Sequence, residues 1–210
     1  MGLFDRKKTS FDSVAPLYTV GNSNTLLVIG LGNIGDEYAE NRHNIGFRAL
    51  DEYQKSHNFS GWVTKKDLSC ELSTGQVGST RVLLAKPTTF MNNSGDAVHK
   101  LQKFYRIYNQ ETVVVHDELD VEFGTIRTRI GGGSAGHNGI KSISNLLGED
   151  YGRIRIGIGP KTHEKMDSAD FVLQDFSKEQ QELLPKIIRE ACSLLDEATT
   201  GQLPEHTIKI

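Results

Sequence analysis

Cysteine is scarce in this chain: Cys70 and Cys192 are the only two among 210 residues. Neither has a second Cys or a His at the spacing of a metal-binding motif. A disulfide framework and a thiolate metal centre are therefore not expected. Two reduced thiols in a cytoplasmic protein are the simpler interpretation.

Long apolar runs and an excess of one charge are also lacking. No stretch approaches the roughly 20 apolar residues that span a bilayer. The formal net charge of -3 excludes a global positive field for nucleic acid, so such binding needs a local patch. Residues 1–24 lack the apolar core of a secretory signal and are rich in charged and small polar residues. They predict a flexible extension before a single catalytic domain over residues 25–210.

Strand-like and helix-like patterns alternate along that domain. Apolar or alternating runs predict strands at residues 25–29, 70–77, 80–85, 112–115, 125–130 and 153–158. Helical periodicity covers residues 45–55, 95–105, 138–147 and a last segment that opens with a capping box at Ser177 and Gln180. Together they predict an α/β protein: a single three-layer domain whose mixed, mostly parallel twisted sheet has helices on both faces. Binding groups should gather at the carboxyl ends of the strands.

The stretch from Gly30 to Gly35 matches the dinucleotide fingerprint G-x-G-x-x-G. A dinucleotide-binding oxidoreductase needs a helix that begins inside this motif, because the helix N-terminus holds the pyrophosphate. Here the convincing helix begins only near Asn44 or Ile45, and three acids lie in between. The glycines favour a tight strand-to-loop turn that exposes Asn33, and the redox interpretation is the weaker one.

Amides, histidines and carboxylates recur where the predicted strands give way to loops. Asn33 and the run Arg42–Asn44 follow the first strand, residues 86–95 follow the third, and His116–Asp120 follow the fourth. This set offers a base, an acid that orients it and amide donors, with no evident nucleophilic Ser or Cys. It fits hydrolysis of an ester by water, in which a neutral His takes the proton of water and a buried Asp holds the ring.

Two further functional classes remain open on the residues alone. A metal-dependent hydrolase could use six candidate ligands, although no H-E-x-x-H or comparable spacing is present: His43, His116, Asp117, Glu118, Asp120 and His137. A non-catalytic RNA-binding protein would use only the basic strand faces around Arg129 and Arg155.

Five motifs, taken together, resemble the bacterial peptidyl-tRNA hydrolase family. They are Gly-Leu-Gly-Asn-x-Gly with Tyr38 and Arg42-His43-Asn44, Thr88–Asn92, His116–Asp120, Gly-Gly-Gly-x-x-Gly-His-Asn-Gly, and Arg153–Gly159. The resemblance runs in order from about residue 25 to about residue 195. It implies a monomeric α/β enzyme, without metal or cofactor, that hydrolyses the ester between a peptide and the 3′-terminal ribose of tRNA.

The resemblance also implies roles for individual residues. His43 corresponds to the catalytic base and Asp117 to its partner. Asn33 and Asn92 correspond to the amides that hold the peptide and the attacked carbonyl, Asn138 to one that orders water, and Tyr38 to a residue beside the 3′-adenosine. Phe90 and Met91 are candidates for shaping the peptide groove.

Arg129 and Arg155 correspond to residues that hold the tRNA 5′-phosphate. Arg127 and Arg129 share one face of a predicted strand, as do Arg153 and Arg155, so neighbouring strands would form a clamp. The polar loop 160–168 is expected to act as a mobile lid. Two departures from the family pattern, Ile34 for Pro and Ala135 for Gly, predict a less rigid turn and an altered loop path.

Overall fold

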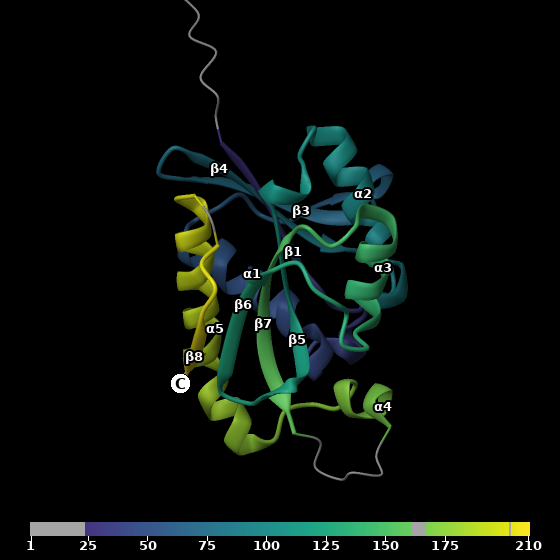
Figure 1. The fold of residues 1–210 in the computed structure, drawn as a ribbon, viewed down its shortest axis with the longest axis vertical. Helices are drawn as coiled ribbons and strands as arrows, with labels where there is room; N and C mark the ends of the chain where they lie inside the picture. The colour runs from purple at the N-terminus through teal and green to yellow at the C-terminus, as the bar shows by residue number, and fades with distance from the viewer. Residues whose placement is uncertain (1–23, 161–166, 202) are drawn as a thin grey trace, which may run out of the picture.

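The computed structural model describes residues 24–160, 167–201 and 203–210, which form one mixed sheet with helices on both sides (Figure 1). The strand order is β2-β3-β4-β1-β5-β7-β6-β8. In chain order the strands are β1 (Thr25–Gly30), β2 (Val63–Lys65), β3 (Cys70–Val77), β4 (Thr80–Pro87), β5 (Thr112–Glu122), β6 (Thr125–Ile130), β7 (Gly152–Gly159) and β8 (Thr207–Lys209). The expected extension and most of the expected lid loop lie outside the described residues, so both stay predictions.

Parallel pairing is confined to the four central strands. β4, β1, β5 and β7 run parallel, whereas β2 and β3 on one side and β6 and β8 on the other pair antiparallel. The mixed sheet is confirmed, but its parallel part is smaller than expected. One reason is local: only Gly78 and Ser79 separate β3 from β4, and so short a link joins antiparallel strands.

The central strands are buried on both faces, as their continuous apolar runs predict. Successive residues of β1 point to opposite sides, so Val28 and Ile29 belong to different cores. Val28 packs in the core that α1 (Ile45–Ser56) and α5 (Lys178–Thr199) complete, and Ile29 in the core that α2 (Ser94–Tyr105) and α3 (Asn138–Leu147) complete. In Figure 1 α5 lies left of the strands, and α2 and α3 lie right of them. The three-layer arrangement is therefore confirmed.

The four main helices match the expected ranges closely. They are α1 (Ile45–Ser56), α2 (Ser94–Tyr105), α3 (Asn138–Leu147) and α5 (Lys178–Thr199). At the start of α5 the Gln180 amide donates to Ser177 Oγ and the Ser177 amide donates to Gln180 Oε1, which confirms the capping box. The shorter helices are α4 (Ser168–Val172), η1 (Asp36–Tyr38), η2 (Arg42–Asn44), η3 (Lys66–Leu68), η4 (Met91–Asn93) and η5 (Asn109–Glu111). Among the described residues, no helix is both long enough and apolar enough to cross a bilayer.

The glycines after β1 serve close packing against α1. A Cβ on Gly30 would lie 2.6 Å from the carbonyl oxygen of Gly46, and one on Gly32 would lie 2.7 Å from the Phe47 ring. Since α1 begins at Ile45, its N-terminus does not open inside the motif, and the geometry of a dinucleotide site is missing there.

Two local expectations are wrong. β5 does not end at Val115 but continues to Glu122, because its extension pairs with β7 through Glu118 and, after an irregularity, again at Glu122. Ala135 does not avoid the left-handed region but adopts a φ of 46°. The backbone path thus keeps a conformation that glycine would adopt more easily.

Candidate functional site

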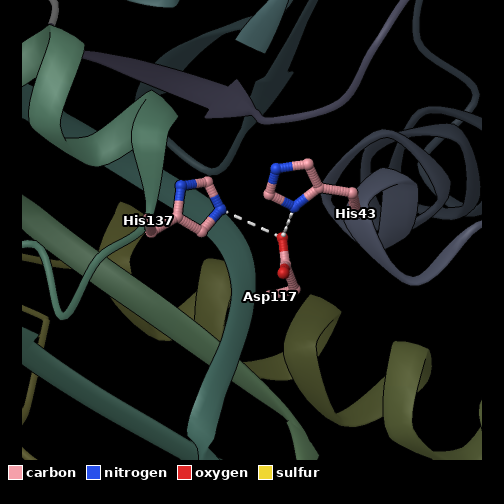
Figure 2. A group of neighbouring side chains, drawn as sticks. All are labelled: His43, Asp117 and His137. Carbon is pink, nitrogen blue, oxygen red and sulfur yellow. Dashed lines mark hydrogen bonds and ion pairs between the residues drawn. The ribbon is translucent and has the colours of Figure 1, made fainter. Parts of the chain in front are cut away.

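Asp117 lies in the extended part of β5, at the carboxyl edge of the parallel strands, and its side chain is buried. Only 1% of Asp117 is exposed, because β7 flanks its strand and the segments before α1 and α3 cover it. A carboxylate at this depth needs donors close by. Two histidines supply them, and Figure 2 shows the carboxylate between the two rings.

His43 is the first of these donors. It sits in η2, the single turn that leads into α1, and 7% of it is exposed. Its Nδ1 lies 2.8 Å from Asp117 Oδ1. Since a carboxylate only accepts, Nδ1 carries the hydrogen and Nε2 keeps its lone pair. Within the described residues, His43 Nε2 makes no hydrogen bond.

His137 is the second donor, and its tautomer is set from both sides. Its Nδ1 accepts from the backbone amides of Gly139 and Ile140, at 3.1 and 3.3 Å, as the N-cap of α3. Its Nε2 therefore carries the hydrogen and donates to Asp117 Oδ1 at 3.0 Å. Both nitrogens of His137 are occupied. The sequence suggests His137 only as a possible metal ligand. Its place directly before a predicted helix was the feature that could have identified it as an N-cap.

The electrostatics of the group follow from this arrangement. Burial disfavours the imidazolium of His43, but the charge and hydrogen bond of Asp117 outweigh burial and raise the pKa of His43. Burial alone would raise the pKa of Asp117, but the two histidines lower it, so the carboxylate stays ionised. His116 behaves differently: burial holds its pKa well below the usual value, and its Nδ1 donates to the Asp117 carbonyl at 2.6 Å.

Asn33 is held in place by a second polar group. Its backbone amide donates to Asn44 Oδ1 at 2.8 Å, and Asn44 Nδ2 donates back to the Asn33 carbonyl at 2.9 Å. The backbone amide of Met91 donates to Asn33 Oδ1 at 2.9 Å. Asn44 stands at the N-cap position of α1, yet its side chain makes no capping bond. Because Oδ1 is occupied, Asn33 Nδ2 is the group left for other acceptors.

A cavity of about 330 Å³ opens beside the His43–Asp117–His137 group. Asn138, the first residue of α3, lines it, and α4 forms the opposite wall with Ser168, Ala169 and Val172. Asn33 instead lines a second cavity of about 340 Å³ together with Asn44. The structure thus brings His43, Asp117 and Asn138 to one cleft.

The remaining candidates for substrate contacts lie around these cavities rather than in their walls. Met91 is buried in the core beneath α3, whereas Phe90 is 57% exposed and Asn92 is exposed in η4. Tyr38 ends η1 and is half-buried. No contact in the structure assigns these four residues to a ligand.

The expected basic face forms on β6 and β7. These strands are antiparallel neighbours that pair Arg127 with Arg155 and Arg129 with Arg153. Arg127, Arg129 and Arg155 line a polar groove of about 450 Å³ together with Glu205, His206 and Thr207 at the start of β8. Arg153 does not take part, because only 2% of it is exposed and its Nη1 donates to the Gly133 carbonyl at 2.8 Å.

The same three side chains beside the cleft are also the group that could hold a metal ion. Within the described part of the chain, the possible ligand atoms of His43, Asp117 and His137 lie within 4.8 Å of one another. An ion between them would have to replace two hydrogen bonds to Asp117 and the protons in them. The chemistry of the donors allows this, so metal dependence is a matter for experiment.

Comparison with known proteins supplies the family. The model of the peptidyl-tRNA hydrolase family matches residues 27–209. A peptidyl-tRNA hydrolase of Aliarcobacter butzleri is 45% identical over 85% of this chain and 94% of its own length. A peptidyl-tRNA hydrolase crystallised with N-propanol is 35% identical, covering 87% of this chain and 92% of that one, with a TM-score of 0.81. The Acinetobacter baumannii enzyme is 34% identical over 84% of this chain and 89% of that one, with a TM-score of 0.78. This chain belongs to the peptidyl-tRNA hydrolase family.

Proposed function

We propose that this protein hydrolyses the ester between a peptide and the 3′-terminal ribose of tRNA, with His43 as the general base. The observation that carries the proposal is the bond of 2.8 Å between His43 Nδ1 and Asp117, which leaves Nε2 as a basic nitrogen at the cleft. Both nitrogens of His137 are occupied, so His137 is not the base.

The reaction follows from these positions. His43 Nε2 takes a proton from water while the water oxygen bonds to the ester carbonyl carbon. Asp117 stabilises the imidazolium that forms. When the bond from that carbon to the ribose oxygen breaks, the imidazolium returns its proton to the leaving oxygen. The amide groups of Asn33, Asn92 and Asn138 are proposed to hold the peptide, the developing oxyanion and the attacking water.

Arg129 and Arg155 are proposed to hold a tRNA phosphate in the groove on β6 and β7. Arg127 lines the same groove, which concentrates positive charge in a chain of net charge -3. Tyr38, Phe90 and Met91 are proposed to contact the 3′ end of the tRNA or the peptide. We further propose that the protein acts as a cytoplasmic monomer and needs no cofactor.

Release of an N-acetylated amino acid from its elongator tRNA tests the proposal, with and without a chelator. Wild type should turn over at the same rate in both conditions, and His43→Ala should lose about three orders of magnitude. The variant should remain folded at the assay temperature, as thermal unfolding would show, although it loses one donor to Asp117. Loss of turnover in the chelator would favour a metal-dependent hydrolase. Binding of tRNA without turnover would favour an RNA-binding protein and refute the proposal.

A further inference from the structure

Arg42 precedes His43 in η2, and its side chain turns away from the catalytic group into a buried site. Only 5% of the residue is exposed. The guanidinium carbon lies 4.4 Å from the centroid of the Phe171 ring and 5.5 Å from that of Phe176. Arginine stacks well on aromatic faces when water is excluded. The charged group next to the proposed base therefore contacts other groups of the protein rather than solvent.

The two terminal nitrogens of the guanidinium bind the segment that includes the α4 wall of the cleft, whereas the buried Nε has no hydrogen-bond partner among the described residues. Nη1 donates to the Gln174 carbonyl at 3.1 Å and more weakly to the Phe171 carbonyl at 3.5 Å. Phe171 lies in α4, and Gln174 follows that helix by two residues. Cations at this end of a helix satisfy carbonyls that have no partner inside the helix. Nη2 donates to Gln180 Oε1 at 3.1 Å, which extends the link to the start of α5.

The backbone around Arg42 also contacts the residues that follow α4. The Arg42 amide donates to the Gln174 carbonyl at 3.0 Å, and Asn41 forms an isolated bridge with Asp175. These contacts use only backbone atoms and are available to Arg42→Lys, so the side chain is not required merely to bring the segments together. The side chain adds a planar guanidinium whose two terminal nitrogens have a fixed spacing. Its hydrogen bonds set how α4 is placed against the cleft.

Resting on the proposed function, we propose that Arg42 is a positioning residue that holds the α4 wall against the segment carrying His43 and thereby sets the affinity for substrate. Ser168, Ala169 and Val172 line the cleft from that wall, whereas the ring of His43 is oriented by its hydrogen bond to Asp117. Loosening the wall should weaken substrate binding without changing the base.

The test compares Arg42→Lys with Arg81→Lys, using an N-acetylated aminoacyl-tRNA as substrate. Lysine keeps the charge but has a single nitrogen, so it cannot reproduce the hydrogen bonds of Nη1 and Nη2 together. The control changes an arginine whose guanidinium also faces an aromatic ring, 5.7 Å from the Tyr105 centroid, but at an exposed position at the opposite end of the parallel strands. Arg42→Lys should raise KM about tenfold with kcat within about twofold of wild type. The pH midpoint should stay unchanged, and backbone amides of residues 168–175 should exchange faster with deuterium. Arg81→Lys should change none of these.

Three results overturn the inference. One is a KM within twofold of wild type, even if the exchange of residues 168–175 increases. Another is a fall in kcat with a shifted pH midpoint, which would place Arg42 in control of His43. If Arg42→Lys does not fold, Phe171→Leu decides from the wall side, because it removes the ring beneath the guanidinium; an unchanged KM then refutes the role. Absence of turnover by wild type would instead refute the proposed function.

Discussion

Two imidazole rings contact the same carboxylate oxygen, and their other nitrogens decide how they differ. His137 uses its second nitrogen to cap α3, whereas His43 keeps Nε2 for a substrate or water. The carboxylate therefore has one donor that is structural and one that belongs to the proposed base. The two histidines take different roles because the backbone around each one is different.

The capping role of His137 predicts a difference between two substitutions. His137→Ala removes the acceptor for two amides and one donor to Asp117, so the free energy of unfolding should fall by about 1–2 kcal/mol or more. His137→Asn should recover part of that loss, because asparagine is a preferred N-cap residue. Urea unfolding at neutral pH measures both variants. Equal destabilisation by Ala and Asn would show that the cap contributes little.

Regular elements were predictable from the sequence where apolar periodicity and end signals agree. The β3 and β6 ranges, the whole of α3 and the Ser177 capping box are examples. The extension of β5 through His116–Asp120 was not predictable, since a run of polar residues is typical of a loop. It stays a strand because β7 pairs with it, and this pairing joins residues far apart in the chain.

The candidate site divides in the same way. The meeting of His43 with Asp117 could be inferred from residue types at strand ends, together with the family resemblance. The burial of Arg153 could not, because in sequence it looks the same as Arg155. Only the placement of Gly133 and Tyr151 around it distinguishes the two.

The contact between α1 and the strands depends on Gly46. A Cβ there would lie 2.4 Å from the Val115 carbonyl oxygen and 2.5 Å from the Leu31 amide nitrogen. These are backbone atoms that cannot turn away, so Gly46→Ala should cost about 3 kcal/mol of stability. It should also lower kcat, since α1 begins just after His43. Thermal and urea unfolding measure the first effect. Gly61→Ala, where a Cβ meets nothing within 4 Å, should stay within about 0.5 kcal/mol of wild type.

The paired strands β6 and β7 predict a salt effect. Replacing Arg129 and Arg155 together by Ala should raise KM for the tRNA ester. The slope of log KM against log salt concentration should also decrease by about one or more. The matched control is Arg81→Ala with Arg189→Ala, which removes the same charge from exposed positions on β4 and α5. A small N-acyl ester should be hydrolysed equally by all three proteins. Equal losses on the small ester would contradict the phosphate assignment.

The stability of the whole domain should depend on pH through its buried histidines. Burial lowers the pKa of His116 in the folded state. Below about pH 6.5 His116 therefore binds a proton in the unfolded chain but not in the folded one, and the free energy of unfolding falls. His43 acts in the opposite sense, because its raised pKa adds stability below that pH. Between pH 7.5 and 5.5, His116 alone should lower the free energy of unfolding by about 1 kcal/mol. Urea unfolding of His116→Gln should show a smaller acid loss than wild type by about that amount, and an equal loss would contradict the assignment.

The pH dependence of single-turnover ester hydrolysis, measured for wild type and Asp117→Asn on the same N-acetylated aminoacyl-tRNA, tests the central claim most directly. The wild-type rate should rise with pH as His43 loses its proton, with a midpoint above about 6.5. Asp117→Asn should move the midpoint down, because the charge that raises the pKa of His43 is gone, and should lower the plateau by about two to four orders of magnitude. A wild-type rate independent of pH between 5 and 8, or a midpoint that Asp117→Asn leaves in place, would contradict a base held by Asp117.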